Sequence, residues 1–207
     1  MIRLSVTDLE TFRYWKDKED GSVEDLIKDL RGLKEPSHEM LASRAFHSLM
    51  EHVVPGSDLD RVSHVDEQGV EWTFDFELDS SIFIPAIREL KIERPWKTCV
   101  GEITLVGKVD NLIGLTVEDY KLSARFEAER YTDSLQWRAY LVLCRARRFV
   151  YRVFQAAYDS MNPYHVRIYE LHSLGLDAYP EMTLDVDEAL DELAAFVKDN
   201  VPEKRAA

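Results

Sequence analysis

The chain has 207 residues, of which 45% are hydrophobic and 31% charged, and its net charge is −13 at pH 7. This composition supports a packed core and excludes wholesale disorder, while two cysteines are too few for a disulfide framework or a four-cysteine metal site. The sequence contains no signal-peptide pattern and no run of about 18 apolar residues. We therefore expect a soluble, cytoplasmic protein that does not associate with a membrane.

Capping residues, hydrophobic periodicity and turn signals predict alternating helices and strands. In chain order we expect helices at 7–15, after Ser22 and from Ser37 to Val53, strands at 61–66, 70–78, 100–113 and 115–122, a helix at 132–146, strands at 149–156 and 165–171, and an acidic helix at 185–198. A capping box at Thr7 to Glu10 is expected to open the first helix. Neither repeats nor linkers interrupt the chain. The prediction is one domain over residues 1–207, of the α/β class, with a central mixed β-sheet flanked by helices.

Charge is distributed unevenly along the chain. The stretch from Arg88 to Arg152 has 13 Lys and Arg against 9 Asp and Glu, whereas the remainder has 13 against 30. Either the acidic ends simply confer solubility, or the basic middle forms a working surface on an acidic body. Under the second interpretation, the candidates for phosphate contacts are Arg125, Arg130, Arg138, Arg145, Arg147, Arg148 and Arg152.

A predicted β-hairpin at residues 107–121 brings carboxylates together. Gly114-Leu115 suits a two-residue type II′ turn, which takes glycine at its first central position. That turn would pair Ile113 with Thr116 and would set Asp110 directly opposite Asp119, with their Cβ atoms about 4.5–5.5 Å apart. Because side chains alternate along a strand, Lys121 would share the face of Asp119, and Glu118 and Tyr120 would take the other.

Two carboxylates facing each other on a half-buried sheet repel unless something compensates their charge. A divalent cation would do so, because it prefers hard carboxylate oxygens as ligands. Lys121 could then stabilise negative charge on a phosphate oxygen. The hairpin alone leaves an alternative open, in which Lys121 simply forms salt bridges with two solvated acids.

The hairpin also carries a family resemblance. G-K-V-D at 107–110 and D-Y-K at 119–121 resemble motifs II and III of the PD-(D/E)XK nucleases. A helical His47 upstream, a Q-x-x-x-Y pair at Gln136 and Tyr140 downstream, and the opening stretch L-S-V-T followed by F-R-Y-W resemble the RecB-type exonuclease branch. These matches occur in family order between residues 4 and 140.

The resemblance implies a restriction-endonuclease-like core and a Mg²⁺- or Mn²⁺-dependent DNA nuclease, an exonuclease rather than an endonuclease, acting in recombination, repair or phage DNA processing. It implies four metal ligands: His47, Asp110, Asp119 and the Tyr120 carbonyl. It further implies that Lys121 is catalytic and that Gln136 and Tyr140 orient DNA or Lys121. Glu51, one helical turn after His47, is either a ligand of a second metal or a surface acid.

The sequence departs from this branch in having Val109 where proline is common, and too few cysteines for an iron–sulfur cluster. The resemblance implies a stand-alone nuclease of the phage type, in a bacterial cell or a phage-infected host. Its expected partner is DNA, with a recombination or single-strand-binding protein as a further candidate, and its oligomeric state stays open. The alternative is a nuclease-fold protein that binds DNA or assembles with other proteins and has little or no catalysis, which the net acidity favours.

Overall fold

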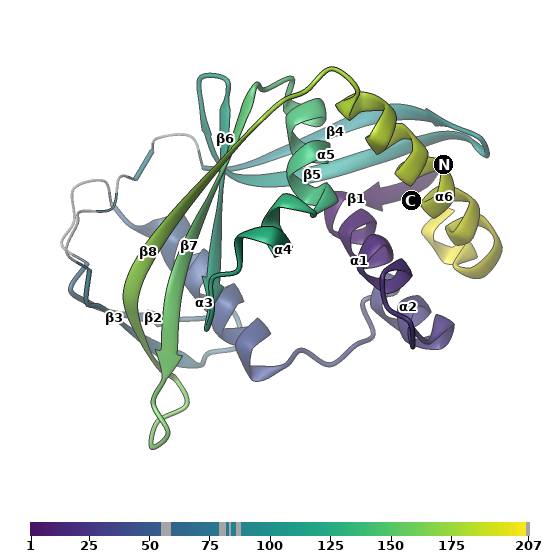
Figure 1. Ribbon diagram of the computed structural model, residues 1–207. Helices are drawn as coiled ribbons and strands as arrows, with labels where there is room; N and C mark the ends of the chain where they lie inside the picture. Colours follow the sequence, from purple (N-terminus) through teal and green to yellow (C-terminus); the bar gives the residue numbers. More distant parts are fainter. Residues whose placement is uncertain (55–58, 79–81, 83, 86–87, 206–207) are drawn as a thin grey trace.

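The computed structural model describes residues 1–54, 59–78, 82, 84–85 and 88–205, and an eight-stranded mixed sheet lies at its centre (Figure 1). The strands are β1 (Ile2–Ser5), β2 (Arg61–Val65), β3 (Glu71–Phe76), β4 (Arg88–Thr98), β5 (Gly101–Ile113), β6 (Thr116–Ser123), β7 (Arg148–Tyr158) and β8 (His165–Asp177). The helices are α1 (Val6–Lys16), α2 (Val23–Leu30), α3 (His38–His52), α4 (Ala128–Thr132), α5 (Leu135–Cys144), α6 (Met182–Asn200) and a 3₁₀ turn at Pro202–Arg205.

The sheet has the order β1-β5-β6-β7-β8-β3-β2, and β4 pairs with β5 outside this path. The pairs β1/β5, β6/β7 and β3/β8 are parallel, and the other adjacent pairs are antiparallel. The protein therefore has the predicted α/β fold with a central mixed sheet flanked by helices. Strands β1 and β4 were not predicted, because β1 is very short and β4 is dominated by charged residues.

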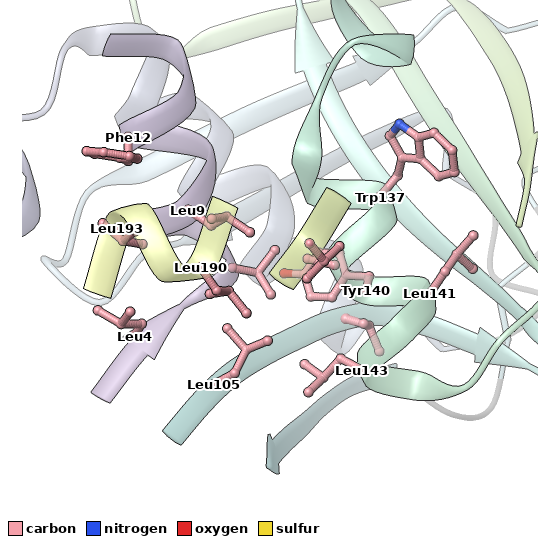
Figure 2. Packing of buried hydrophobic residues seen from close by; sticks show 14 of the residues in the cluster. Leu4, Leu9, Phe12, Leu105, Trp137, Tyr140, Leu141, Leu143, Leu190 and Leu193 are labelled. Atoms are coloured by element: carbon pink, nitrogen blue, oxygen red, sulfur yellow. The ribbon is translucent and has the colours of Figure 1, made fainter. Parts of the chain in front are cut away.

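Two hydrophobic clusters cover the two faces of the sheet. On one face α1, α5 and α6 pack against β1, β5 and β7, and Leu4, Leu9, Leu105, Tyr140 and Leu190 lie in this cluster (Figure 2). On the other face α3 packs against β3, β7 and β8 through a second cluster. Burying a large apolar side chain stabilises the fold by about 1.5–3 kcal/mol, so both clusters hold the strands between them in fixed positions.

The apolar stripe of α3 explains how this helix is attached. Ala42, Phe46 and Met50 are buried, at the helical spacing that places residues on one side, and the Phe46 ring packs 4.9 Å from that of Phe154 in β7. The attachment fixes the direction of the polar residues on the flank of the same helix, which include His47.

Two local predictions were wrong in detail. The capping box of α1 is formed by Ser5 and Asp8, two residues earlier than expected, because the helix follows directly on β1, which ends at Ser5. The helix predicted at 132–146 is α5, which begins only at Leu135 because Ser134 caps it by accepting the N–H of Gln136 at 3.0 Å. The short helix α4 before it, which ends at Thr132, was not predicted. No helix in the described part of the chain is long and apolar enough to cross a membrane.

Candidate metal and catalytic centre

The hairpin of β5 and β6 has the predicted register at its tip. Ile113 pairs with Thr116 and Asn111 with Glu118, around Gly114 at a positive φ of 59°. The ladder between these strands stops there, and the pair predicted next, Asp110 opposite Asp119, is not formed. The expectation was wrong at this step because the Asp110 carboxylate takes up the backbone N–H of Tyr120, at 2.6 Å, in place of a strand-to-strand bond.

Asp110 joins the hairpin to α3. Its second oxygen lies 3.3 Å from Nδ1 of His47, and its side chain is only 12% exposed. Burial favours the neutral carboxyl, but the neighbouring His47 and Lys121 and the Tyr120 N–H outweigh it, so the pKa of Asp110 lies below its ordinary value. Burial lowers the pKa of His47, but the carboxylates of Asp110 and Asp119 raise it by more, so this pKa lies above its ordinary value.

Asp119 lies on the opposite face of β6 from Glu118, as predicted. Its carboxylate contacts the Lys121 ammonium at 2.6 Å and accepts a long, 3.4 Å hydrogen bond from the Gln136 amide of α5. Burial is the main cause that raises the pKa of Asp119 to about 6; Asp110 adds to it and Lys121 opposes it. The pKa of Lys121 is raised, because the two aspartates outweigh its own burial.

Glu118 has a structural partner on the other face. It is 4% exposed, and its carboxylate accepts two hydrogen bonds from the Arg152 guanidinium, at 2.9 and 3.2 Å. The alternation of β6 therefore separates an Asp119–Lys121 pair that faces α5 from a Glu118–Arg152 pair that holds β6 to β7.

Glu89 of β4 was missed by the sequence analysis. One ligand atom from each of Glu89, His47 and Asp110 lies within 4.8 Å of the other two. Glu89 also forms an ion pair with Lys108, and burial raises its pKa. No local pattern could have identified it, because only the pairing of β4 with β5 brings it to Asp110.

The same residues line a small cavity between α3, β4 and the hairpin. Its lining residues are His47, Met50, Glu51, Arg88, Glu89, Asp110, Asn111 and Tyr120. Glu51 thus joins the site from α3, as its spacing from His47 predicted. Asn111 is fully buried there beside the Tyr120 hydroxyl, and neither group forms a hydrogen bond of ordinary geometry with the described residues.

The remaining predicted residues lie on α5. Gln136 reaches Asp119, whereas the Tyr140 hydroxyl donates to the Lys108 carbonyl at 2.8 Å. The Tyr140 ring also covers Gly107, where an added Cβ would come within 2.8 Å of it. Tyr140 therefore contacts the strand just before Asp110, and its predicted action on Lys121 or DNA stays a prediction.

The seven arginines that are candidates for phosphate contacts divide into two groups. Arg138, Arg148 and Arg152 form hydrogen bonds or ion pairs within the fold. The other four arginines, which are exposed, are Arg125, Arg130, Arg145 and Arg147.

The donor set suits a hard divalent cation. Carboxylate oxygens of Asp110 and Glu89 and an imidazole nitrogen of His47 converge, and these are ligands that Mg²⁺ and Mn²⁺ accept. Asp119 falls outside the group of three, so its ligation, like that of the Tyr120 carbonyl, remains a prediction.

Comparisons with known proteins give a fold-level likeness. No protein-family model and no curated protein matches the sequence. The solved structure of SSO0001 is similar over 94% of this chain and 76% of its own, with a TM-score of 0.53 and 13% identity. An alkaline exonuclease (LHK-Exo) from Laribacter hongkongensis is similar over 98% of this chain and 90% of its own, with a TM-score of 0.48 and 9% identity. The structure of LHK-Exo in complex with dAMP is similar over 98% of this chain and 91% of its own, with a TM-score of 0.47 and 11% identity. At these identities the likeness to SSO0001 concerns the fold.

Proposed function

We propose that this protein is a divalent-cation-dependent nuclease that hydrolyses phosphodiester bonds in DNA, with Mg²⁺ or Mn²⁺ as its cofactor. The observation that carries the proposal is that the His47–Asp110 pair and the Asp119–Lys121 pair lie close enough to act on each other electrostatically, although His47 comes from a helix far from the hairpin in sequence. This is the constellation for which the sequence resembles the RecB-type branch of the PD-(D/E)XK nucleases.

His47, Asp110 and Asp119, with the Tyr120 carbonyl, would hold the cation. When bound, the cation supplies positive charge at the scissile phosphate and a water of lowered pKa. The Lys121 ammonium, kept charged by Asp119, would stabilise the negative charge that develops on the phosphate oxygens. Gln136 would hold the Asp119 carboxylate in place from α5.

We propose exonuclease rather than endonuclease activity, following the same resemblance. The test uses end-labelled linear duplex, a labelled single strand and a covalently closed circle, each with Mn²⁺ or with EDTA. The expected result is Mn²⁺-dependent release of short products from linear DNA, with the closed circle left intact. Cleavage of the circle would instead assign an endonuclease.

A second candidate is a nuclease-fold protein that binds DNA or a protein partner without cleaving. The net charge of −13 favours the protein-binding form of this candidate, because an acidic surface is repelled by DNA and suits protein contacts. The same assay separates the two functions. Retained DNA binding without any Mn²⁺-dependent cleavage, by a protein whose melting curve shows it to be folded, would reject the enzyme and support the module.

A further inference from the structure

We propose that Glu89 is an additional ligand of the divalent cation, and that Lys108 is the counter-ion that occupies the Glu89 carboxylate until the cation binds. The inference rests on the proposed function and deepens it. Glu89 lies outside the motifs by which the sequence resembles the nuclease family, and Lys108, which stands within the G-K-V-D stretch, is given no role by that resemblance. The pairing of β4 with β5 brings both residues to the site.

The distances allow Glu89, His47 and Asp110 to share one ion. Their ligand atoms lie within 4.8 Å of one another. Bonds of about 2.1 Å to Mg²⁺ put two ligands on opposite sides of an ion about 4.2 Å apart. Adjacent ligands lie only about 3.0 Å apart, a spacing that the 3.3 Å between His47 Nδ1 and Asp110 already approaches. Rotation of the Glu89 side chain would bring its oxygen the remaining distance, which is up to about 1.8 Å.

The backbone of Glu89, which lies next to the site, has a positive φ angle. Arg88 pairs with Asn111 and Leu90 with Val109, so Glu89 lies at the position opposite Asp110. Its φ of 53° is in the left-handed region, which a residue other than glycine adopts at a cost in free energy. The surrounding pairs enforce this conformation, and the carboxylate lines the same cavity as His47 and Asp110.

A cation can displace Lys108 from the Glu89 carboxylate. Its ammonium pairs with Glu89, but its side chain is 57% exposed, whereas that of Glu89 is 13% exposed. The ammonium can therefore move into water while the carboxylate stays in the cavity. Without either Lys108 or a cation, Glu89 would face the negative charges of Asp110 and Glu51 uncompensated.

Asn111 provides independent support for a ligand in this cavity. The side chain is fully buried, it lines the cavity, and its carboxamide atoms have no hydrogen-bond partner among the described residues. A buried amide without a partner is costly. A carboxamide oxygen is of a kind that binds hard cations, so an ion held by Glu89 would supply the missing partner of the Asn111 oxygen.

The test measures Mn²⁺ affinity, by calorimetry and by the electron paramagnetic resonance of free Mn²⁺, in the full chain without DNA. We expect Glu89→Gln to weaken binding at least 10-fold and Lys108→Met to tighten it several-fold, because a competitor is removed. In the Glu89→Gln background, Lys108→Met should have no effect. Glu93→Gln and Lys91→Met are matched controls, since these residues form a lysine–glutamate pair at 2.8 Å on the same strand, and both should bind as the wild type does.

Unchanged affinity in either Glu89→Gln or Lys108→Met overturns the inference. If Glu89→Gln binds as the wild type does while Asp110→Asn does not, the inference fails and the proposed function stands. If the wild type itself binds no Mn²⁺, the cation-dependent nuclease fails as well. Misfolding cannot imitate the expected result, because a tighter complex in Lys108→Met requires a folded site.

Discussion

The Asp110 carboxylate accepts the backbone N–H of Tyr120 at 2.6 Å, and so a side chain of β5 takes the place of a strand-to-strand hydrogen bond. This contact opens the two strands at the level of the site. Asp110 can then turn toward His47 on one face of the sheet, while Asp119 and Lys121 lie toward α5 on the other. The proposed site occupies the point where the strands separate.

The separation of the two faces of β6 predicts opposite phenotypes for neighbouring acids. Asp119→Asn should abolish Mn²⁺-dependent DNA cleavage and leave the fold intact, because the amide keeps the volume and removes only the charge. Glu118→Gln should retain cleavage but lower the free energy of unfolding by roughly 1.5–3 kcal/mol, because it weakens the charged hydrogen bonds to Arg152. Cleavage assays and urea melts of both variants check this; loss of cleavage only in Glu118→Gln would mean that the faces are assigned wrongly.

The pKa of Asp119 predicts how the metal-free protein responds to pH. Burial raises this pKa from 3.8 to about 6, so the folded protein holds the proton more tightly than the unfolded chain does. The contribution of Asp119 to stability is therefore full below pH 3.8 and is lost as the pH rises toward 6. This contribution to the unfolding free energy is up to about 3 kcal/mol, because the folded and unfolded pKa values differ by about 2 and a difference of one corresponds to about 1.36 kcal/mol.

The measurement compares the unfolding free energy of the wild type and Asp119→Asn in EDTA between pH 4 and pH 7. The wild type should lose stability relative to the variant as the pH rises, since other titrating groups are common to both proteins. A difference that is constant over this range would contradict the raised pKa.

The exposed arginines that follow β6 in the chain should carry part of the proposed DNA binding. Arg125→Ala and Arg130→Ala should each weaken DNA binding and reduce the slope of log affinity against log salt concentration by about 1. The reason is that a protein with one phosphate contact fewer releases fewer counterions from the DNA when it binds. Arg147→Ala is the matched control, as this exposed arginine follows α5 and its backbone bonds Leu115 at the hairpin tip. Equal slopes in all four proteins would place the DNA elsewhere.

Gly107 sets how closely α5 approaches β5. A Cβ there would lie 2.6 Å from a Leu143 methyl and 2.8 Å from the Tyr140 ring. Gly107→Ala should therefore lower the free energy of unfolding by about 1–3 kcal/mol through overpacking. In Gly107→Ala combined with Leu143→Ala, the alanine at 107 should cost less than it does alone, which thermal or urea melts can measure. Equal costs in the two backgrounds would show that Leu143 is not the residue that is displaced.

The sequence by itself determined the features encoded by neighbouring residues. The turn at Gly114-Leu115 fixed the register of the β5–β6 tip, strand alternation separated Asp119 from Glu118, and helical spacing put His47 and Glu51 on one face of α3. Each depends on contacts within a few residues or within one hairpin. The predicted mixed sheet flanked by helices followed from the order of such elements.

Only the tertiary structure decided how these parts meet. The strand β4 lies outside the main path of the sheet and is rich in charge, so it carries no alternation to reveal it, and its pairing with β5 alone brings Glu89 to Asp110. The opening of the hairpin at Asp110 likewise depends on a carboxylate that competes with the backbone for the Tyr120 N–H. Such a competition is settled by the packing of α3 and α5 on opposite faces, which no local pattern of residues contains.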